Sequence, residues 1–176
     1  MKFCLHVFIL LFSLTQVAAQ SARPNPIKWS FTSKDAGNGE TDLIFTGTID
    51  EGWYTYSQKL ENDLGPVPTS FTFKSGAHYS IVGEAQESGE RFTEYDKIFE
   101  MNLVKFKHSA VFTQRVKVGD YSKPITGYVS YMTCNAEMCL PPKDVDFKFV
   151  LKPATTQLKK STTPAKNKPK GGTKKG

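Results

Sequence analysis

Two cysteines near the end of the patterned part of the chain carry the side chains best suited to chemistry. Cys134 and Cys139 are separated by four residues, and the third cysteine, Cys4, lies in an amino-terminal apolar segment. Thiol–disulfide exchange needs an attacking thiolate and a second thiol that resolves the mixed disulfide, and this pair supplies both. In the chain-entropy account, a disulfide across so short a loop contributes about 2 kcal/mol, against about 5 kcal/mol for a loop of roughly 100 residues. The pair is therefore better explained as a redox centre than as a fold stabiliser.

Two other interpretations of the cysteines stay open. The first is a passive hairpin clip in a non-enzymatic β-sandwich interaction module. Against it, Pro141 and Pro142 follow the second cysteine and cannot pair as an inner strand, which leaves Cys139 near an open edge that a partner could reach. The second is a copper(I) site in which Met132 and Met138 join the cysteines, since soft sulfur ligands suit this ion. Nothing in the strand and loop pattern forces those sulfurs to converge.

The charges near the pair favour a reductant or an electron carrier. No Lys or Arg lies between Cys134 and Cys139, and Glu137 disfavours a thiolate by like-charge repulsion. We therefore expect thiol pKa values that are not strongly depressed. A strong oxidant, by contrast, has a reduced form that is stabilised as thiolate.

Other chemistries find no support in the sequence. The three histidines, His6, His78 and His108, show no metal-ligand spacing. There is no Ser/His/Asp set, no paired-carboxylate pattern, and no phosphate-loop or dinucleotide-binding motif. We therefore predict neither a bound metal nor an organic cofactor.

Strands with a period of two flank the cysteines. Residues 125–133 place Ile125, Val129 and Tyr131 on one face, and residues 145–151 alternate in the same way. Turn signals separate further short strands, which are predicted at residues 28–32, 42–49, 53–57, 70–73, 79–82, 99–106 and 110–118. No long stretch has helical periodicity. This pattern predicts an all-β, antiparallel β-sandwich.

The chain divides into three parts. Residues 1–19 are predicted to be a secretory signal peptide, because Lys2 precedes an apolar run and small residues precede Gln20. Residues 20–151 are long enough for one domain with its own core. Residues 152–176 contain eight Lys and no acidic residue and are predicted to be a disordered tail. An exported protein is expected in a compartment where disulfides form.

The basic tail dominates the charge of the chain. Of the net charge of +6, the tail contributes eight positive charges and Lys2 one, so that residues 3–151 carry a net charge of −3. We expect the tail to act as a solvated spacer, with weak contact to an anionic surface as the alternative. The export signal argues against nucleic acid as a partner.

The cysteine hairpin resembles a known family. Residues 129–147 read Val-Ser-Tyr-Met-Thr-Cys-Asn-Ala-Glu-Met-Cys-Leu-Pro-Pro-Lys-Asp-Val-Asp-Phe, and they are similar to the active-site hairpin of the amino-terminal periplasmic domain of the thiol:disulfide interchange protein DsbD. Residues 52–56, Gly-Trp-Tyr-Thr-Tyr, resemble the Gly-aromatic-Tyr-x-Tyr segment of that domain. The resemblance covers about residues 27–151, although the better-known members have one more residue between the cysteines.

The resemblance carries expectations about the fold and the site. It implies an immunoglobulin-like fold and two tyrosines packed on the sulfurs, Tyr54 and Tyr56. It also implies a mobile cap loop that shields the cysteines. Residues 94–99 match this loop best, with Tyr95, Asp96 and Phe99 as shielding or supporting residues.

The resemblance also implies a function. The domain would exchange electrons in the periplasm with thioredoxin-like oxidoreductases, with Cys139 meeting the partner and Cys134 resolving the mixed disulfide. A separate membrane protein would then supply the electrons, because a Lys-rich tail stands where the family continues into membrane and thioredoxin-like parts. Such a component of a protein-disulfide reductase system would be linked to disulfide isomerisation or cytochrome c maturation.

Overall fold

The described chain forms two antiparallel β-sheets packed face to face. The computed structural model describes residues 24–61, 64–97 and 99–153, so the predicted signal peptide and most of the predicted tail lie outside the described residues. The strands are β1 (Ile27–Gly37), β2 (Glu40–Ile49), β3 (Tyr54–Tyr56), β4 (Ser70–Phe73), β5 (Tyr79–Asp96), β6 (Met101–Val118), β7 (Ile125–Tyr131), β8 (Thr133–Cys134) and β9 (Lys143–Phe149).

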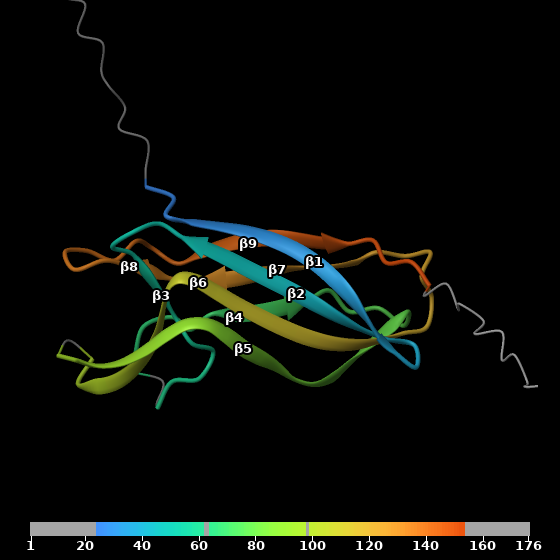
Figure 1. The fold of residues 1–176 in the computed structure, drawn as a ribbon, viewed down its shortest axis with the longest axis horizontal. Helices are drawn as coiled ribbons and strands as arrows, with labels where there is room; N and C mark the ends of the chain where they lie inside the picture. Colours follow the sequence, from blue (N-terminus) through green and yellow to red (C-terminus); the bar gives the residue numbers. More distant parts are fainter. Residues whose placement is uncertain (1–23, 62–63, 98, 154–176) are drawn as a thin grey trace, which may run out of the picture.

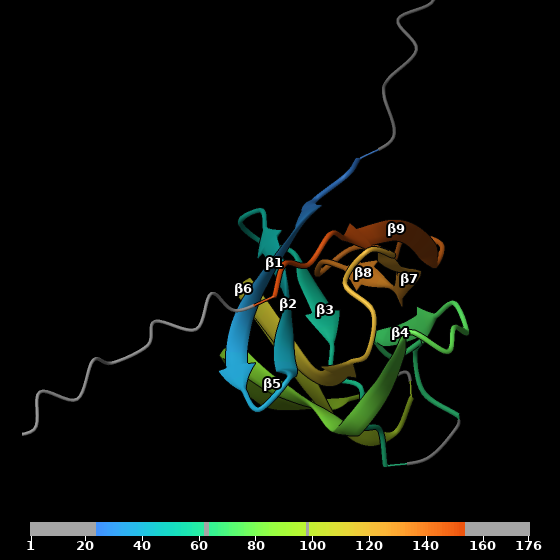
Figure 2. The ribbon, with the colours of Figure 1, turned by 90° about the vertical axis from the view of Figure 1, so that its right-hand side faces the viewer.

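The larger sheet is built around β6. Its order is β1-β2-β6-β3-β8, and β5 pairs with the opposite edge of β6. The smaller sheet has the order β4-β7-β9 and lies to one side of the larger one (Figure 2). This arrangement confirms the predicted all-β, immunoglobulin-like sandwich. The described residues contain no helix, and hence none that is long and apolar enough to cross a membrane.

Aromatic side chains fill the space between the sheets. Phe45 and Phe112 of the larger sheet and Phe147 and Phe149 of the smaller one are almost fully buried. The Phe45 and Phe147 rings lie 5.0 Å apart in an edge-to-face arrangement. Burial of so much apolar surface is the main stabilising contribution to the fold. The alternation predicted for residues 125–133 and 145–151 supplies part of this core.

The prediction of separate strands at residues 99–106 and 110–118 is wrong. Both belong to one strand, β6, which bends at a bulge where its register with β5 shifts between Gly89 and Arg91. His108 has a left-handed φ of 55° at this bend, so the polar residues between the two predicted strands are accommodated within one strand. The edge of β6 that does not face β5 pairs with β3 before the bend, at Lys105 and Phe106, and with β2 after it, from Ser109 onward.

The predicted strand at residues 79–82 is too short. In the structure β5 runs on to Asp96, so residues 94–96 of the expected cap loop are strand. β5 is an edge strand whose residues are mostly exposed, and an edge strand needs no apolar alternation. The expected cap segment is therefore the tip of the long β5–β6 hairpin. This tip and the cysteine loop lie at the same end of the molecule (Figure 1).

Candidate active site at the Cys134–Cys139 disulfide

The two cysteines form a disulfide at the point where the chain passes from one sheet to the other. β7 ends at Tyr131 in the smaller sheet, and β8 pairs with β3 in the larger sheet. The Thr55 hydroxyl donates to the Met132 carbonyl at 2.9 Å, which secures this crossing. Cys134 and Cys139 then pair across a tight loop, with Cα atoms 4.0 Å apart.

A turn stabilised by Asn135 closes the cysteine loop. The Asn135 side-chain oxygen accepts hydrogen bonds from the backbone N–H groups of Glu137 and Met138, at 2.9 and 2.8 Å. The Asn135 N–H donates to the Met138 carbonyl at 2.9 Å. Asn side chains commonly mimic a backbone turn in this way. The turn returns the chain so that Cys139 lies beside Cys134.

The two sulfurs differ in their surroundings. Cys134 has no exposed surface and packs with Tyr56, Met101 and Leu103, whereas Cys139 is exposed. The Tyr56 hydroxyl donates a hydrogen bond to the Cys134 sulfur at 3.1 Å. Burial, with the neighbouring Tyr54 and the Asp96 charge, raises the pKa of Tyr56 well above its ordinary value, so this hydroxyl keeps its proton.

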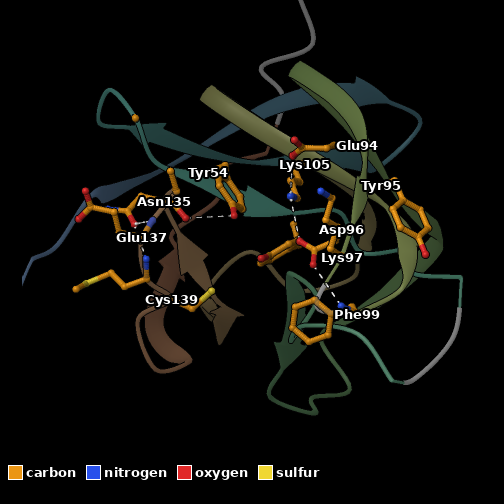
Figure 3. Close-up of a pocket in the computed structure, with 14 residues that line it drawn as sticks. Tyr54, Glu94, Tyr95, Asp96, Lys97, Phe99, Lys105, Asn135, Glu137 and Cys139 are labelled. Atoms are coloured by element: carbon orange, nitrogen blue, oxygen red, sulfur yellow. Dashed lines mark hydrogen bonds and ion pairs between the residues drawn. The ribbon is translucent and has the colours of Figure 1, made fainter.

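Cys139 lies in the wall of an open pocket of about 640 Å³. Figure 3 shows Cys139 on one side of this pocket and the tip of the β5–β6 hairpin on the other. Charged residues of both signs line it, namely Glu94, Asp96, Lys97, Lys105 and Glu137. A partner's sulfur could approach Cys139 through this pocket, whereas protein atoms surround Cys134.

The structure brings the predicted tyrosines to the disulfide. Tyr54 lies opposite Cys134 in the β3–β8 ladder, and its ring meets that of Tyr56 edge to face at 5.7 Å between centroids. Two residues apart on one strand, the two tyrosines share a face of the sheet. The Tyr54 hydroxyl donates a long hydrogen bond to the Asn135 carbonyl, at 3.4 Å.

The three residues predicted from the cap segment occupy different positions. Phe99 packs against the buried cluster that contains Cys134. Tyr95 is 57% exposed and points away from Cys139 (Figure 3). The Asp96 carboxylate accepts a hydrogen bond from the Phe99 N–H at 3.3 Å and thereby supports the turn. Of the two candidate shields, Phe99 is the one in contact with the cysteine cluster.

Sequence reasoning missed Lys105, which also lines the pocket. It lies on β6, is only 2% exposed, and pairs with Glu94 at 3.0 Å and Asp96 at 3.3 Å. Burial by itself opposes the charge, but interactions with Glu94, Tyr54 and Asp96 outweigh it and raise the pKa of the Lys105 ammonium. The signal in the sequence was a Lys at an inward position of the alternation that begins with Met101 and Leu103.

The copper(I) alternative gains no support from the positions of the methionines. Met132 packs against the interior cluster around Cys134, while Met138 is half exposed on the loop and lines the pocket. Among the described residues, no three His, Cys, Asp or Glu side chains are grouped so as to hold a metal ion.

Comparisons with solved structures agree with this fold. The chain superposes on the N-terminal domain of DsbD from Neisseria meningitidis in its reduced form with a TM-score of 0.50 and 16% identity, over 71% of this chain and 85% of that one. It superposes on the N-terminal periplasmic domain of ScsB from Proteus mirabilis with a TM-score of 0.54 and 15% identity, over 72% of this chain and 47% of that one. At these identities the likeness concerns the fold alone.

The sequence comparison supplies the family. Curated protein sequences give no significant match. Residues 22–151 match the family described as the N-terminal part of the thiol:disulfide interchange protein DsbD, which supports a role in thiol:disulfide interchange. This match covers the whole sandwich together with its Cys134–Cys139 disulfide. The chain belongs to the family of DsbD N-terminal domains.

Proposed function

We propose that this domain carries electrons between proteins in the periplasm, and that Cys139 makes the covalent contact with its partners. The observation that carries the proposal is the asymmetry of the disulfide. Cys134 is fully buried under the Tyr56 hydroxyl, whereas Cys139 is exposed at the wall of the pocket. Access to a sulfur decides which one a partner can attack.

The exchange has two steps. In the reduced domain the Cys139 thiolate attacks a partner disulfide, forms a mixed disulfide, and displaces one partner sulfur as a thiolate. The Cys134 thiol then loses its proton and attacks the Cys139 sulfur, which releases the second partner thiolate and restores the Cys134–Cys139 disulfide. The partner gains two electrons and, with two protons, becomes a dithiol. A dithiol protein that runs the same steps in reverse returns the domain to its reduced form.

The partners in this proposal are thioredoxin-like oxidoreductases, and the electron donor is a separate membrane protein. The described residues hold one cysteine pair, so the domain stores one pair of electrons and must be recharged after each exchange. Disulfide isomerisation and cytochrome c maturation are the processes that the family resemblance points to. We infer export through a signal peptide at residues 1–19, and the periplasmic domain of Proteus ScsB supports the same compartment.

Trapping experiments test the roles of the two sulfurs. The reduced single variants Cys134→Ser and Cys139→Ser are mixed with an oxidised thioredoxin-like protein, and mixed disulfides are counted on non-reducing gels. Cys134→Ser should accumulate the mixed disulfide because the resolving thiol is gone, and Cys139→Ser should capture little. The double variant, which has neither thiol, sets the background.

Two outcomes would contradict the proposal. Capture by Cys139→Ser alone would reverse the roles of the sulfurs. If neither variant captures a partner, and the disulfide has a reduction potential below about −300 mV, the pair is a structural clip. An exchange protein should fall between roughly −180 and −270 mV.

A further inference from the structure

One side of the sandwich is open between β4 and β5. β4 is the end strand of the smaller sheet and β5 is an edge strand of the larger one, and they run along the same side of the molecule (Figures 1 and 2). A groove of about 470 Å³ lies between them, and no described residue lines both this groove and the Cys139 pocket. A hydrogen bond of 2.6 Å from the Tyr79 hydroxyl to the Lys74 carbonyl closes one end, and one of 3.3 Å from the Gln58 side chain to the Ala85 carbonyl closes the other.

β4 presents unpaired backbone groups to this groove. Its ladder to β7 continues into a hydrogen bond of 2.9 Å from the Lys74 N–H to the Thr126 carbonyl. Backbone groups of an antiparallel strand alternate between its two edges, so Thr72 is bonded to β7, while the N–H and C=O groups of Phe71 and Phe73 point to the other edge. No strand of the described chain pairs with that edge. Such an edge is a template for an added strand.

The groove itself is apolar and electrically neutral. The Phe71 and Phe73 side chains are half-buried in it, and Ile81 is 44% exposed. The charged residues among its described lining are Lys59 and Glu84, which pair with each other at 2.9 Å and are largely exposed. The groove therefore suits an uncharged segment with apolar side chains.

A buried glutamine of β6 adds one polar group. Gln114 is 5% exposed, and its side-chain nitrogen donates at 3.2, 3.3 and 2.9 Å to three backbone carbonyls, those of Val82, Gly83 and Arg115. No described residue donates to its side-chain oxygen. This oxygen is not enclosed either, because the Trp29 nitrogen is the only enclosed side-chain nitrogen or oxygen without a partner in the described chain. A fixed acceptor thus faces the groove and lacks a donor.

We propose that this groove binds an extended, uncharged segment of another protein, which adds to β4 as an antiparallel strand. Residues of the segment opposite Phe71 and Phe73 lie on the same face as those rings and enter the groove, and the residues between them face solvent. An inward Trp or Tyr donates to the Gln114 oxygen. The site is separate from the disulfide and holds a partner whether or not electrons are exchanged.

A single strand fits this edge better than a second copy of the chain. β4 has four residues, a length of about 13 Å. Pairing of two such edges would bury much less than the roughly 800 Å² that each partner buries in a stable interface. It would also leave the groove unfilled, whereas a separate segment occupies both the edge and the groove.

Hydrogen exchange of single amides, measured by NMR, tests the proposal. The probe is the acetylated and amidated peptide Ser-Thr-Trp-Thr-Val-Thr-Ser at millimolar concentration, in which Trp and Val are the inward residues. The Phe71 and Phe73 amides should exchange about tenfold more slowly with the peptide than without it, because they gain hydrogen bonds. The Thr72 amide is already bonded to β7 and should change little.

Two N-methylated peptides form a matched pair. Methyl groups on the Trp and Val nitrogens remove the N–H groups that face β4, so binding should be lost. A methyl group on the nitrogen of the central Thr, which faces solvent, should leave binding largely unchanged.

Variants of the protein locate the site. Ile81→Arg places a charged side chain in the groove at an exposed position and should abolish the protection. Val150→Arg makes the same change at an exposed apolar residue outside the groove and should retain it. Replacing the peptide's Trp by Phe should weaken binding about fivefold in the wild type, equivalent to about 1 kcal/mol for one hydrogen bond, and should have no effect in Gln114→Met.

The inference is overturned if the Phe71 and Phe73 amides gain no protection, if the two N-methylated peptides bind alike, or if Ile81→Arg binds as well as Val150→Arg. Protection without peptide overturns it too. If that protection grows with protein concentration, a second copy occupies the edge, and if it is lost in a chain that ends at Leu151, the tail does. Should Gln114→Met fail to fold, the Ile81→Arg and N-methyl comparisons decide.

Discussion

At the scale of single residues, the disulfide is asymmetric because one sulfur belongs to a strand and the other to a loop. Cys134 is the last residue of β8 and lies opposite Tyr54, so the sheet encloses it. Cys139 follows a tight turn and precedes Leu140, whose N–H returns to the Thr133 carbonyl at 2.8 Å. The spacing of the cysteines predicted their pairing, but the difference in exposure depends on the crossing of the chain between the sheets.

Tyr56→Phe should weaken the fold and make the Cys134 thiol less acidic. The ring is retained, but the hydroxyl that donates to the Cys134 sulfur is lost. Loss of one hydrogen bond costs about 0.5–1.5 kcal/mol of unfolding free energy. A donor favours the thiolate over the thiol, so its removal raises the pKa of Cys134 in the reduced protein and slows its alkylation at neutral pH. Denaturant unfolding and alkylation in a Cys139→Ser background measure both effects.

The matched control is Tyr54→Phe. Its hydroxyl donates to the Asn135 carbonyl at 3.4 Å, at the long limit for a hydrogen bond, whereas the Tyr56 hydroxyl donates to the Cys134 sulfur at 3.1 Å. Alkylation of Cys134 should change little in this variant. Equal effects of the two substitutions would show that the Tyr56 hydroxyl has no special influence on the sulfur.

Lys105 shows where reasoning from a single sequence ends at this scale. Its partners Glu94 and Asp96 are 11 and 9 residues away along the chain. Their meeting depends on the register of β5 against β6, which shifts at the bulge between Gly89 and Arg91. Since one residue of slip turns every side chain to the other face, the pairing could not be read from spacing. Only the inward position of Lys105 was visible beforehand.

At the scale of elements, the bend in β6 determines where the hairpin points. Gly89 has a φ of 117°, and a Cβ at this position would meet the Ser109 carbonyl, so the bulge requires glycine. The sequence predicted one strand that ends at residue 106 and another that begins at residue 110, with polar residues between them. A polar stretch can mark either a break between two strands or a bulge within one strand. Here the β6 residues on both sides of the stretch pair with β5, so the stretch is a bulge.

An ion-paired histidine at this bend should make stability depend on pH. His108 approaches Glu90 at 2.8 Å and Glu51 at 2.9 Å through its two ring nitrogens, which ties β6 to β5 and to the loop before β3. These carboxylates raise the pKa of His108 above 6.5. The contribution of the protonated His108 to the free energy of unfolding is then complete below pH 6.5. It is lost as the pH rises through the higher pKa that His108 has in the folded state.

His108→Gln measures this contribution. Gln keeps a polar side chain but cannot carry the charge. In the wild type the melting temperature should decline as the pH rises from about 6 to 8, and in His108→Gln this part of the decline should be absent. Parallel pH profiles of the two proteins would contradict the role of His108. The effect should also diminish in high salt, because these side chains are exposed.

At the scale of the whole molecule, the sandwich places its functional end away from most of its core. The aromatic core between the sheets involves β1, β2, β6, β7 and β9, while the disulfide belongs to a smaller cluster with Tyr56, Met101 and Leu103. The antiparallel sandwich was predictable because the alternating apolar residues of its strands are those that face the core. The edge strand β5 was not, since its exposed residues alternate little and are mostly polar.

The boundary between domain and tail should be sharp, and it can be located to one residue. Leu151 is 6% exposed and belongs to the main core, whereas Val150 is 70% exposed. A chain that ends at Leu151 should therefore keep the melting temperature of the full chain, because all of the packed residues remain. A chain that ends at Val150 loses a buried leucine side chain, worth roughly 2 kcal/mol or more. For a domain of this size, between the 60–100 and 150–250 residue classes, each kcal/mol corresponds to roughly 4 °C. Calorimetry on the two truncated proteins should thus show a drop of several degrees between them, and an equal drop in both would mean that residues beyond Leu151 contribute to the fold.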